Sequence, residues 1–179
     1  YHSVIHYREA YGGHACNGIL FNHESPRRGV NFVTKKIVQG LVRIKQGKQK
    51  ILTLGNLYSR RDWGHAKDYV ESMWKILQQK KPNDFVIATK TSHSVKDFIN
   101  ICAKKLNINL VWKNRGLKEV GINKLTKKII IKVDKKYFRE TEVDDLIGDF
   151  TKAKKLLKWK PKYSFNKLVD DMIYNELNG

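Results

Sequence analysis

The residues best suited to binding chemistry in this chain are its arginines, which are few and gathered in short polar segments. Only eight of the 36 basic residues are Arg. Five of the eight lie in three segments that also carry Asn, Asp, Glu or Gly: Arg27, Arg28, Arg60, Arg61 and Arg139. Arg grips phosphate through a rigid fork with two parallel hydrogen bonds, whereas Lys is a hydrated point charge on a flexible stem. This pattern predicts an anion-binding site made from the Arg segments.

The richest of these segments runs over residues 19–29. An apolar stretch, Ile-Leu-Phe, is followed there by Asn-His-Glu-Ser-Pro-Arg-Arg-Gly. Ligands of α/β sheets bind at the carboxyl ends of strands, which is where Asn22 and His23 are expected. Simpler interpretations stay open. Arg27 and Arg28 are then surface charges beside a turn, His23 is a hydrogen-bonded core residue, and Arg61 forms a structural ion pair with its neighbour Asp.

Length and composition indicate a globular chain. With 179 residues and 41% hydrophobic content it can bury a core. Cys16 and Cys102 lie in apolar contexts without metal spacing, so we expect plain buried thiols in a reducing compartment. His2, His6 and His14 lack further ligands that would complete a metal site. No apolar run approaches the roughly 20 residues of a membrane span. We therefore expect a cytoplasmic location, no metal and no membrane association.

The net charge of 36 − 17 = +19 requires that nucleic acid be considered as a partner. Basic domains gain affinity for a phosphate backbone by releasing its counterions. Here the charge is mostly Lys and is spread along the chain between apolar residues. The sequence carries no helix-turn-helix, zinc or RNA-binding signature. We therefore expect a main role other than binding nucleic acid, which stays an alternative.

Hydrophobic periodicity predicts strands alternating with helices, which is the pattern of an α/β layer fold. Helices are expected over residues 1–11, 32–45, 65–79, 94–106, 149–157 and 165–177. Strands are expected over residues 15–21, 51–54, 85–88, 110–112 and 129–133, and a loop over the Lys- and Gly-rich stretch between the last two. In the helix over 65–79, the apolar spacing predicts that Tyr69, Met73, Trp74 and Leu77 face the core, as does Trp63 just before it.

Several motifs identify a family. They are, in chain order, Tyr-Arg-Glu-Ala-Tyr at 7–11, the segment over 16–29, Phe-Val-Thr-Lys-Lys at 32–36, Leu-Gly-Asn-Leu at 54–57, Arg-Asp-Trp-Gly-His-Ala-Lys-Asp-Tyr-Val at 61–70, Asp-Phe-Val-Ile-Ala-Thr at 84–89, Tyr-Phe-Arg at 137–139 and Gly-Asp at 148–149. Together they resemble GDP-mannose 4,6-dehydratase, a family of extended short-chain dehydrogenases/reductases. The resemblance covers nearly the whole chain but only the C-terminal half of the enzyme.

The resemblance implies the fold and its division. It implies the end of a Rossmann-type parallel sheet plus a small α/β substrate-binding lobe. Residues 1–50 would be mainly the remnant of the Rossmann-type domain with its connecting segment, and residues 51–179 mainly the lobe, with the two interleaved. The first helix and the strand after it would be pieces of the larger sheet, with apolar surface left uncovered.

The resemblance also implies a reaction. The family is expected to convert GDP-mannose to GDP-4-keto-6-deoxymannose with NADP as cofactor, toward GDP-fucose and related deoxyhexoses. Its Gly-rich dinucleotide turn, its catalytic Thr and Glu and its Tyr-x-x-x-Lys pair are expected upstream of Tyr1, so no catalytic residue is assigned in this chain. We expect the 179-residue chain to be inactive on its own.

Site residues carry over by position. His23 and Arg28 match cofactor-binding positions, and Asn22 matches a substrate contact. Arg61 and Arg139 match the arginines of the diphosphate site, Glu142 matches the acid at the ribose hydroxyls, and Val33 and Lys36 match the guanine region. One departure is visible: the family's Arg-Pro-x-Glu is Arg-Glu-Thr-Glu at 139–142 here, and losing Pro loosens the spacing of that pair.

Three interpretations follow from different classes. The first is the substrate-binding half of this dehydratase, or of a near relative acting on another nucleotide sugar. The second is a catalytically dead remnant that binds nucleotide sugar or pairs, as a homo-oligomer or with a complete homologue, in a regulatory role. The third is a basic polyanion-binding module.

Overall fold

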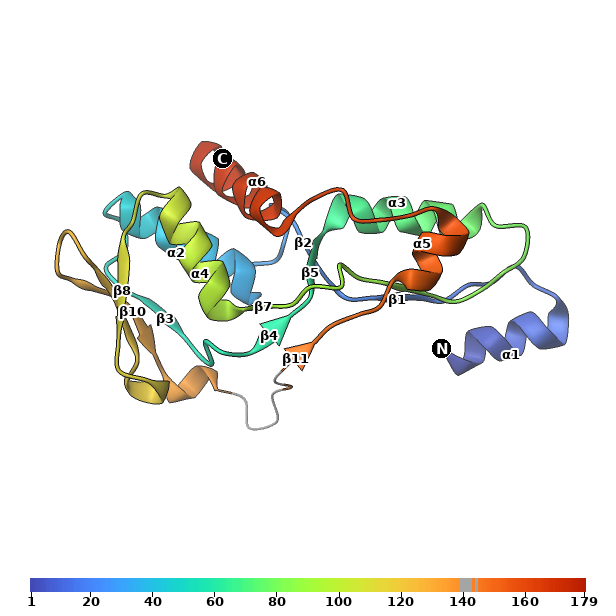
Figure 1. Cartoon of the computed structure of the whole chain (residues 1–179), viewed down its shortest axis with the longest axis horizontal. Helices are drawn as coiled ribbons and strands as arrows, with labels where there is room; N and C mark the ends of the chain where they lie inside the picture. Colours follow the sequence, from blue (N-terminus) through green and yellow to red (C-terminus); the bar gives the residue numbers. More distant parts are fainter. Residues whose placement is uncertain (139–142, 144) are drawn as a thin grey trace.

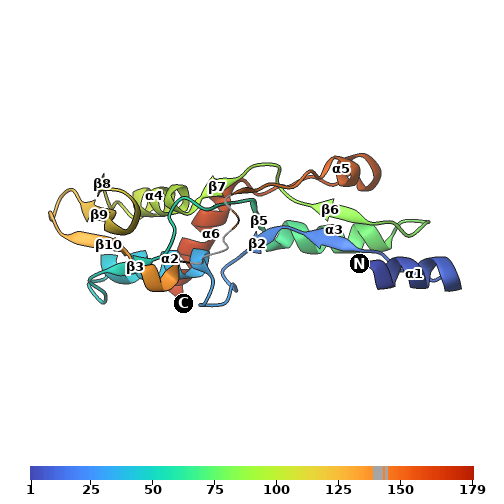
Figure 2. The same cartoon turned by 90° about the horizontal axis from the view of Figure 1, so that it is seen from below.

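The computed structural model describes residues 1–138, 143 and 145–179. Figure 1 shows an elongated α/β molecule with α2, α4 and a sheet at one end and α1, α3 and α5 at the other, and Figure 2 shows the same division. Its helices are α1 (His2–Tyr11), α2 (Val33–Lys45), α3 (Ala66–Leu77), α4 (Val95–Lys105), α5 (Thr151–Leu157) and α6 (Phe165–Asn178), with short 3-10 helices η1 (Gly116–Lys118) and η2 (Lys135–Tyr137). The α-helices lie where periodicity predicts them.

Short strands alternate with these helices. They are β1 (Gly18–Leu20), β2 (Asn22–Glu24), β3 (Leu52–Leu54), β4 (Arg60–Arg61), β5 (Trp63–His65), β6 (Phe85–Ile87), β7 (His93–Ser94), β8 (Leu110–Lys113), β9 (Val120–Asn123), β10 (Ile129–Val133) and β11 (Asp145–Leu146). Among the described residues they pair in the orders β1-β6, β3-β10-β9-β8, β11-β4-β7 and β2-β5. The pairs β1-β6, β2-β5, β3-β10 and β4-β11 are parallel. This is the α/β class that the sequence predicts.

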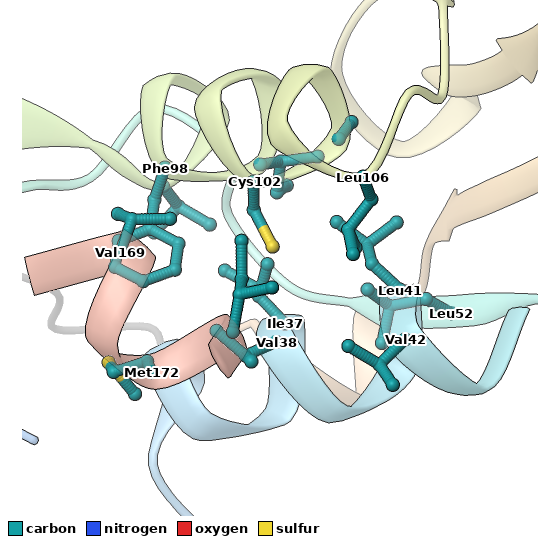
Figure 3. Close-up of a cluster of buried hydrophobic side chains, with 14 of the residues drawn as sticks. Ile37, Val38, Leu41, Val42, Leu52, Phe98, Cys102, Leu106, Val169 and Met172 are labelled. Atoms are coloured by element: carbon teal, nitrogen blue, oxygen red, sulfur yellow. The ribbon is translucent and has the colours of Figure 1, made fainter. Parts of the chain in front are cut away.

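The larger core cluster lies between α2, α4, α6 and β3 (Figure 3). Ile37 and Leu41 of α2 and Phe98 and Cys102 of α4 are fully buried in it. These are the inward faces that a 3.6-residue period predicts. Burial raises the pKa of the Cys102 thiol to about 12, so the thiol is a packing group rather than a nucleophile.

A second, smaller cluster lies under α3, α5 and β6. Its buried members are Tyr69, Ile76, Phe85, Ile87, Ala153, Leu157 and Trp159. The indole N–H of Trp159 donates to the Asp68 carbonyl at 2.9 Å, which ties the segment after α5 to α3. Each cluster combines early and late parts of the chain. The larger one contains residues of α2 and α6, and the smaller one contains residues of α3 and of the segment around α5.

The predicted inner face of α3 is partly wrong. Tyr69 is buried, as is Trp63, but Trp74 is 62% exposed and Leu77 is 61% exposed, and Met73 is also exposed. Apolar residues occupy two adjacent stripes of this helix, one turned by about 100° from the other. Tertiary packing against β6 and α5 selects the stripe with Tyr69 and Ile76.

Two further predictions need correction. The stretch between β8 and β10 contains β9, which pairs antiparallel with both neighbours and has Gly121 within it. Four residues interrupted by Gly are too short to show a period of two, so the strand depends on its partners. In the segment expected to be a buried strand, Ile19 of β1 is 45% exposed, and Cys16 before it is only half-buried.

The surface around α1 and β1 carries uncovered apolar side chains, as the resemblance implies. Helix α1 has no buried residue. Tyr7 and Tyr11 are 66% and 73% exposed. Parallel sheets are normally covered on both faces and contain more than two strands. Among the described residues, β1 pairs only with β6.

A carboxylate attaches α1 to the rest of the molecule. Both Asp84 carboxylate oxygens accept from the Arg8 guanidinium at 3.0 Å, and one also accepts from the Asn17 backbone N–H at 2.8 Å. Hydrogen bonding from Arg8 is the main reason that the pKa of Asp84 lies well below its usual range. A carboxylate with a lowered pKa contributes stability above its unfolded-state pKa, and this is lost as the pH falls through the folded-state pKa.

We therefore predict that Asp84→Asn loosens α1. The free energy of unfolding should fall by about 1 kcal/mol at pH 7, a modest value because the pair is partly exposed, and the difference from the native chain should shrink below about pH 4. Urea unfolding at several pH values measures this. Asp170→Asn, which removes an ion pair with Lys105 on an exposed surface, is the control. A pH-independent difference for Asp84→Asn would contradict the explanation.

Candidate functional site

One cavity of about 310 Å³ lies where β2, β4, β5, α2 and η2 meet. Its lining residues are Asn22, Glu24, Asn31, Phe32, Val33, Lys36, Leu54, Gly55, Asn56, Ser59, Arg61, Trp63, Val95 and Tyr137. They come from segments that are up to about a hundred residues apart in the sequence. Glu24 and Leu54, the last residues of β2 and β3, are among the lining residues, and carboxyl ends of strands are where α/β sheets hold ligands.

The structure brings together four of the residues predicted to bind substrate. Asn22, Val33, Lys36 and Arg61 all line this cavity. The set combines an amide, an aliphatic side chain and two cations. Such a set can accept hydrogen bonds, cover the face of an apolar ring and bind an anion.

The two residues predicted to bind cofactor lie outside the lining of this cavity. Side chains alternate along a strand, so Asn22 and Glu24 of β2 face the cavity and His23 does not. The His23 ring nitrogen Nδ1 is 3.0 Å from the Phe21 carbonyl oxygen, and the ring lies 5.1 Å from that of Tyr69. His23 is therefore partly a packing residue, as the simpler interpretation has it.

Arg28 is held behind the cavity by Glu24. Its Nε lies 3.1 Å from Glu24 Oε2, and its guanidinium lies 3.4 Å from the centre of the Phe32 ring. The Thr34 hydroxyl donates to the same Glu24 oxygen at 2.5 Å. Burial raises the pKa of Glu24, and the hydrogen bond from Thr34 and the charge of Arg28 act against this rise. Glu24, which the sequence did not single out, thus ties the 19–29 segment to α2.

The two neighbouring arginines of β4 point to different places. Arg61 lines the cavity, and its guanidinium donates to the carbonyls of Arg60 and Val143 at 2.7 and 2.6 Å. Arg60 instead donates to Ser92, with Asp97 and Asp145 within 4 Å. Because side chains alternate along the strand, Arg61 faces the cavity and Arg60 faces the other side.

The carboxylate of Asp62, next to Arg61, is fully buried and saturated with donors. Its Oδ1 accepts from the backbone N–H and the hydroxyl of Thr89, and its Oδ2 accepts from the N–H groups of Lys90 and Gly148. A buried carboxylate is tolerated only when it is compensated in this way. Instead of a simple pair with Arg61, Asp62 joins three chain segments behind the cavity.

Lys36 and Tyr137 line the cavity and contact each other. The Lys36 ammonium lies 3.7 Å from the centre of the Tyr137 ring. The backbone of η2 packs directly against Gly55. A Cβ at Gly55 would lie 2.2 Å from the Tyr137 carbonyl oxygen, so a larger residue there would push η2 away. The Gly in Leu-Gly-Asn-Leu was the available sequence signal for this contact, because only Gly permits such an approach.

Arg139 and Glu142 lie outside the described residues. Tyr137, shortly before them, lines the cavity, and Val143, just after them, accepts from Arg61. Their assignments to the diphosphate and the ribose stay predictions.

A tyrosine and a lysine elsewhere have the spacing of a catalytic pair. Tyr163 and Lys167 are four residues apart, but Tyr163 precedes Ser164, the N-cap of α6. Its ring stacks on that of His65 at 4.1 Å. Tyr163 therefore packs outside the helix that carries Lys167 and does not share a helical face with it.

The described part of the chain shows neither a metal-binding cluster nor a membrane-spanning helix. No group of three or more His, Cys, Asp or Glu side chains there is arranged to hold a metal ion. None of the helices described has the length and apolar character needed to cross a bilayer.

Comparison with known proteins assigns the chain. The sequence model of a family described as GDP-mannose 4,6 dehydratase matches residues 1–172. The chain belongs to the GDP-mannose 4,6-dehydratase family. It is 52% identical over 177 residues to the GDP-mannose 4,6 dehydratase of Dictyostelium discoideum, covering 99% of this chain and 50% of that protein. It is 51% identical over 177 residues to that of Homo sapiens, covering 99% and 48%. The chain thus spans about half the length of its GDP-mannose 4,6-dehydratase relatives, and that half is the C-terminal one.

Solved structures agree on the fold. The chain of RMD from Pseudomonas aeruginosa, solved with NADPH, superposes with a TM-score of 0.80 at 14% identity, over 99% of this chain and 53% of that one. A dTDP-glucose 4,6-dehydratase from Bacillus anthracis, solved with NAD, gives 0.75 at 16% identity, over 99% and 49%. The fold of this GDP-mannose 4,6-dehydratase family member is therefore that of the extended short-chain dehydrogenases/reductases.

The arrangement around Asp62 leads to a prediction. Asp62→Ala should lower the free energy of unfolding by about 3 kcal/mol, because it leaves the N–H groups of Thr89, Lys90 and Gly148, in two other chain segments, without their acceptor. Asp145→Ala, which removes a half-exposed carboxylate 3.7 Å from Arg60, should change it by less than about 1 kcal/mol. Urea unfolding followed by circular dichroism compares the two. Equal effects would show that Asp62 is not a joint between segments.

Proposed function

We propose that this chain is the nucleotide-sugar-binding half of an NADP-dependent GDP-mannose 4,6-dehydratase, a lyase acting in the cytoplasm toward GDP-fucose or a related deoxyhexose. The observation that carries the proposal is the convergence of Asn22, Val33, Lys36 and Arg61 on one cavity. The residues match substrate positions of the family, and three separate parts of the chain supply them.

The proposed binding mode assigns one part of the ligand to each region of the cavity. The guanine lies toward Val33 and Lys36, where an aliphatic surface and a cation can meet a ring and its carbonyl oxygen. The diphosphate lies at Arg61, whose fork suits phosphate oxygens. The sugar extends toward Asn22, the first residue of β2. Arg139 and Glu142 complete the diphosphate and ribose contacts in this proposal.

The residues of this chain fit only one edge of the NADP cofactor. Arg28 is held at a defined place by Glu24 and can offer N–H groups to a phosphate, and His23 adjoins Glu24 on β2. The remaining contacts, including the Gly-rich turn, belong to the other half of the family fold. When bound, the cofactor supplies the oxidation and the later return of hydride. The residues described here bind and orient the sugar nucleotide.

A second role is pairing. The exposed apolar residues of α1, β1 and α3 favour a partner that covers them, and a patch of this kind commonly marks an interaction site. We propose that the partner is a family chain, either a copy of this one or a complete homologue.

Replacing Arg61 tests the binding proposal. Arg61→Ala should weaken GDP binding by about 1.5 to 3 kcal/mol, the usual contribution of a charge-assisted hydrogen bond. A double replacement of Lys127 and Lys128, which lie in the exposed turn before β10, should leave GDP affinity unchanged. Isothermal titration calorimetry with GDP measures both variants against the native chain.

Titration with a short DNA duplex at two salt concentrations distinguishes the dehydratase proposal from the alternative of a polyanion-binding module. Nonspecific binding through scattered Lys should be weak and should fall steeply with salt, because it depends on counterion release. Tight duplex binding that resists salt, with no detectable GDP binding, would replace the dehydratase proposal by the polyanion module.

The isolated chain should form no product. Incubation with GDP-mannose and NADP is expected to yield no 4-keto sugar, because the residues that hold the hydride acceptor and the base at C4 are assigned to the other half. Product formation proportional to the amount of purified chain would contradict this division of labour.

A further inference from the structure

Ser59 is a buried polar residue in the wall of the cavity. It is only 2% exposed, and among the residues that the structure describes its Oγ has no hydrogen-bond partner. A buried hydroxyl without a partner costs about 1 to 3 kcal/mol by protein mutational data. Ala in its place would avoid this cost, so the position of the hydroxyl calls for a partner beyond those that the described part of the chain supplies.

The backbone fixes where Ser59 stands. Its carbonyl accepts from the N–H of Val95 at 3.1 Å, and the Leu57 carbonyl accepts from the N–H of Lys96 at 2.8 Å. Both donors belong to the first turn of α4. Ser59 is thus attached to a helix of the larger core, and its side chain needs only a turn about χ1, between staggered positions, to change where its hydroxyl points.

Strand alternation places Ser59 beside Arg61. The two are separated by Arg60, which is turned toward Ser92 and Asp145, and both line the cavity. Residues two apart on an extended chain stand about 7 Å from each other on one face. A hydroxyl and a guanidinium at this spacing can contact neighbouring oxygens of a single diphosphate.

We propose that Ser59 is a ligand-binding residue whose hydroxyl donates to the diphosphate of a nucleoside diphosphate sugar, next to Arg61. The inference rests on the proposed function of the cavity and adds to it a contact that no family motif indicated. The diphosphate supplies the partner that Oγ lacks in the cavity wall. A hydrogen bond from a hydroxyl to a charged oxygen is stronger than one to a neutral oxygen.

Ser59→Ala in the full 179-residue chain is the test. GDP affinity by calorimetry should fall about tenfold, the equivalent of one charge-assisted hydrogen bond. The thermal midpoint of the ligand-free variant should stay equal or rise, because an unpaired buried hydroxyl is removed. The control is Ser72→Ala, which removes a buried hydroxyl that donates to the Tyr69 carbonyl at 2.6 Å outside this cavity. It should lower the thermal midpoint and leave GDP affinity unchanged.

Guanosine, observed by saturation-transfer NMR, shows which part of the ligand the hydroxyl meets. Because guanosine has no phosphate, its affinity should be the same for the native chain and Ser59→Ala. An equal loss for guanosine would put the contact on the ribose or base and overturn the diphosphate assignment. Unchanged GDP affinity in Ser59→Ala would overturn the inference while leaving the proposed function standing. Failure of the native chain to bind GDP at all would overturn both.

Discussion

The buried carboxylate of Asp62 is the interaction on which the arrangement of this molecule depends. It accepts hydrogen bonds from Thr89 after β6 and from Gly148 before α5, two segments that lead into the smaller core cluster. Asp62 itself is followed by Trp63, which packs in the larger cluster. Because a buried charge must be compensated on all sides, these segments cannot move apart independently. One side chain therefore holds the two clusters in a fixed relation.

This constraint has a direct consequence for the candidate site. Arg61, the last residue of β4, directly precedes Asp62, and its guanidinium donates to the carbonyl of Val143. With the neighbouring residue held, Arg61 is directed into the cavity at the same time as Asn22 and Lys36 approach from β2 and α2. A binding site for a long, charged ligand requires such prior fixation, because ordering several long side chains on binding would offset much of the affinity.

The molecule is less complete at its other end. Helix α1 is attached largely through Arg8 and the carboxylate of Asp84 and leaves aromatic side chains exposed. The relatives are about twice as long as this chain. An incomplete parallel sheet beside a well-packed lobe is what half of such a fold should show, since the lobe has a core of its own and the sheet edge does not.

Sequence by itself determined the α/β class, the positions of the α-helices and the family. These depend on local periodicity and on short motifs, both of which can be read without knowing any contact. It also indicated the Arg segments, and two of them meet around the cavity, with Arg61 in its wall and Arg28 behind it. Val33 and Lys36, which the family resemblance assigns to the guanine region, line the same cavity.

Only the tertiary structure decided which apolar stripe of α3 is buried, that β9 is a strand, and that His23 faces away from the cavity while Glu24 faces it. Each of these depends on a partner distant in the chain: β6 and α5 for α3, β8 and β10 for β9, β5 for β2. The unpartnered hydroxyl of Ser59 belongs to the same group. A sequence shows that a residue is polar, but only packing shows whether anything nearby satisfies it.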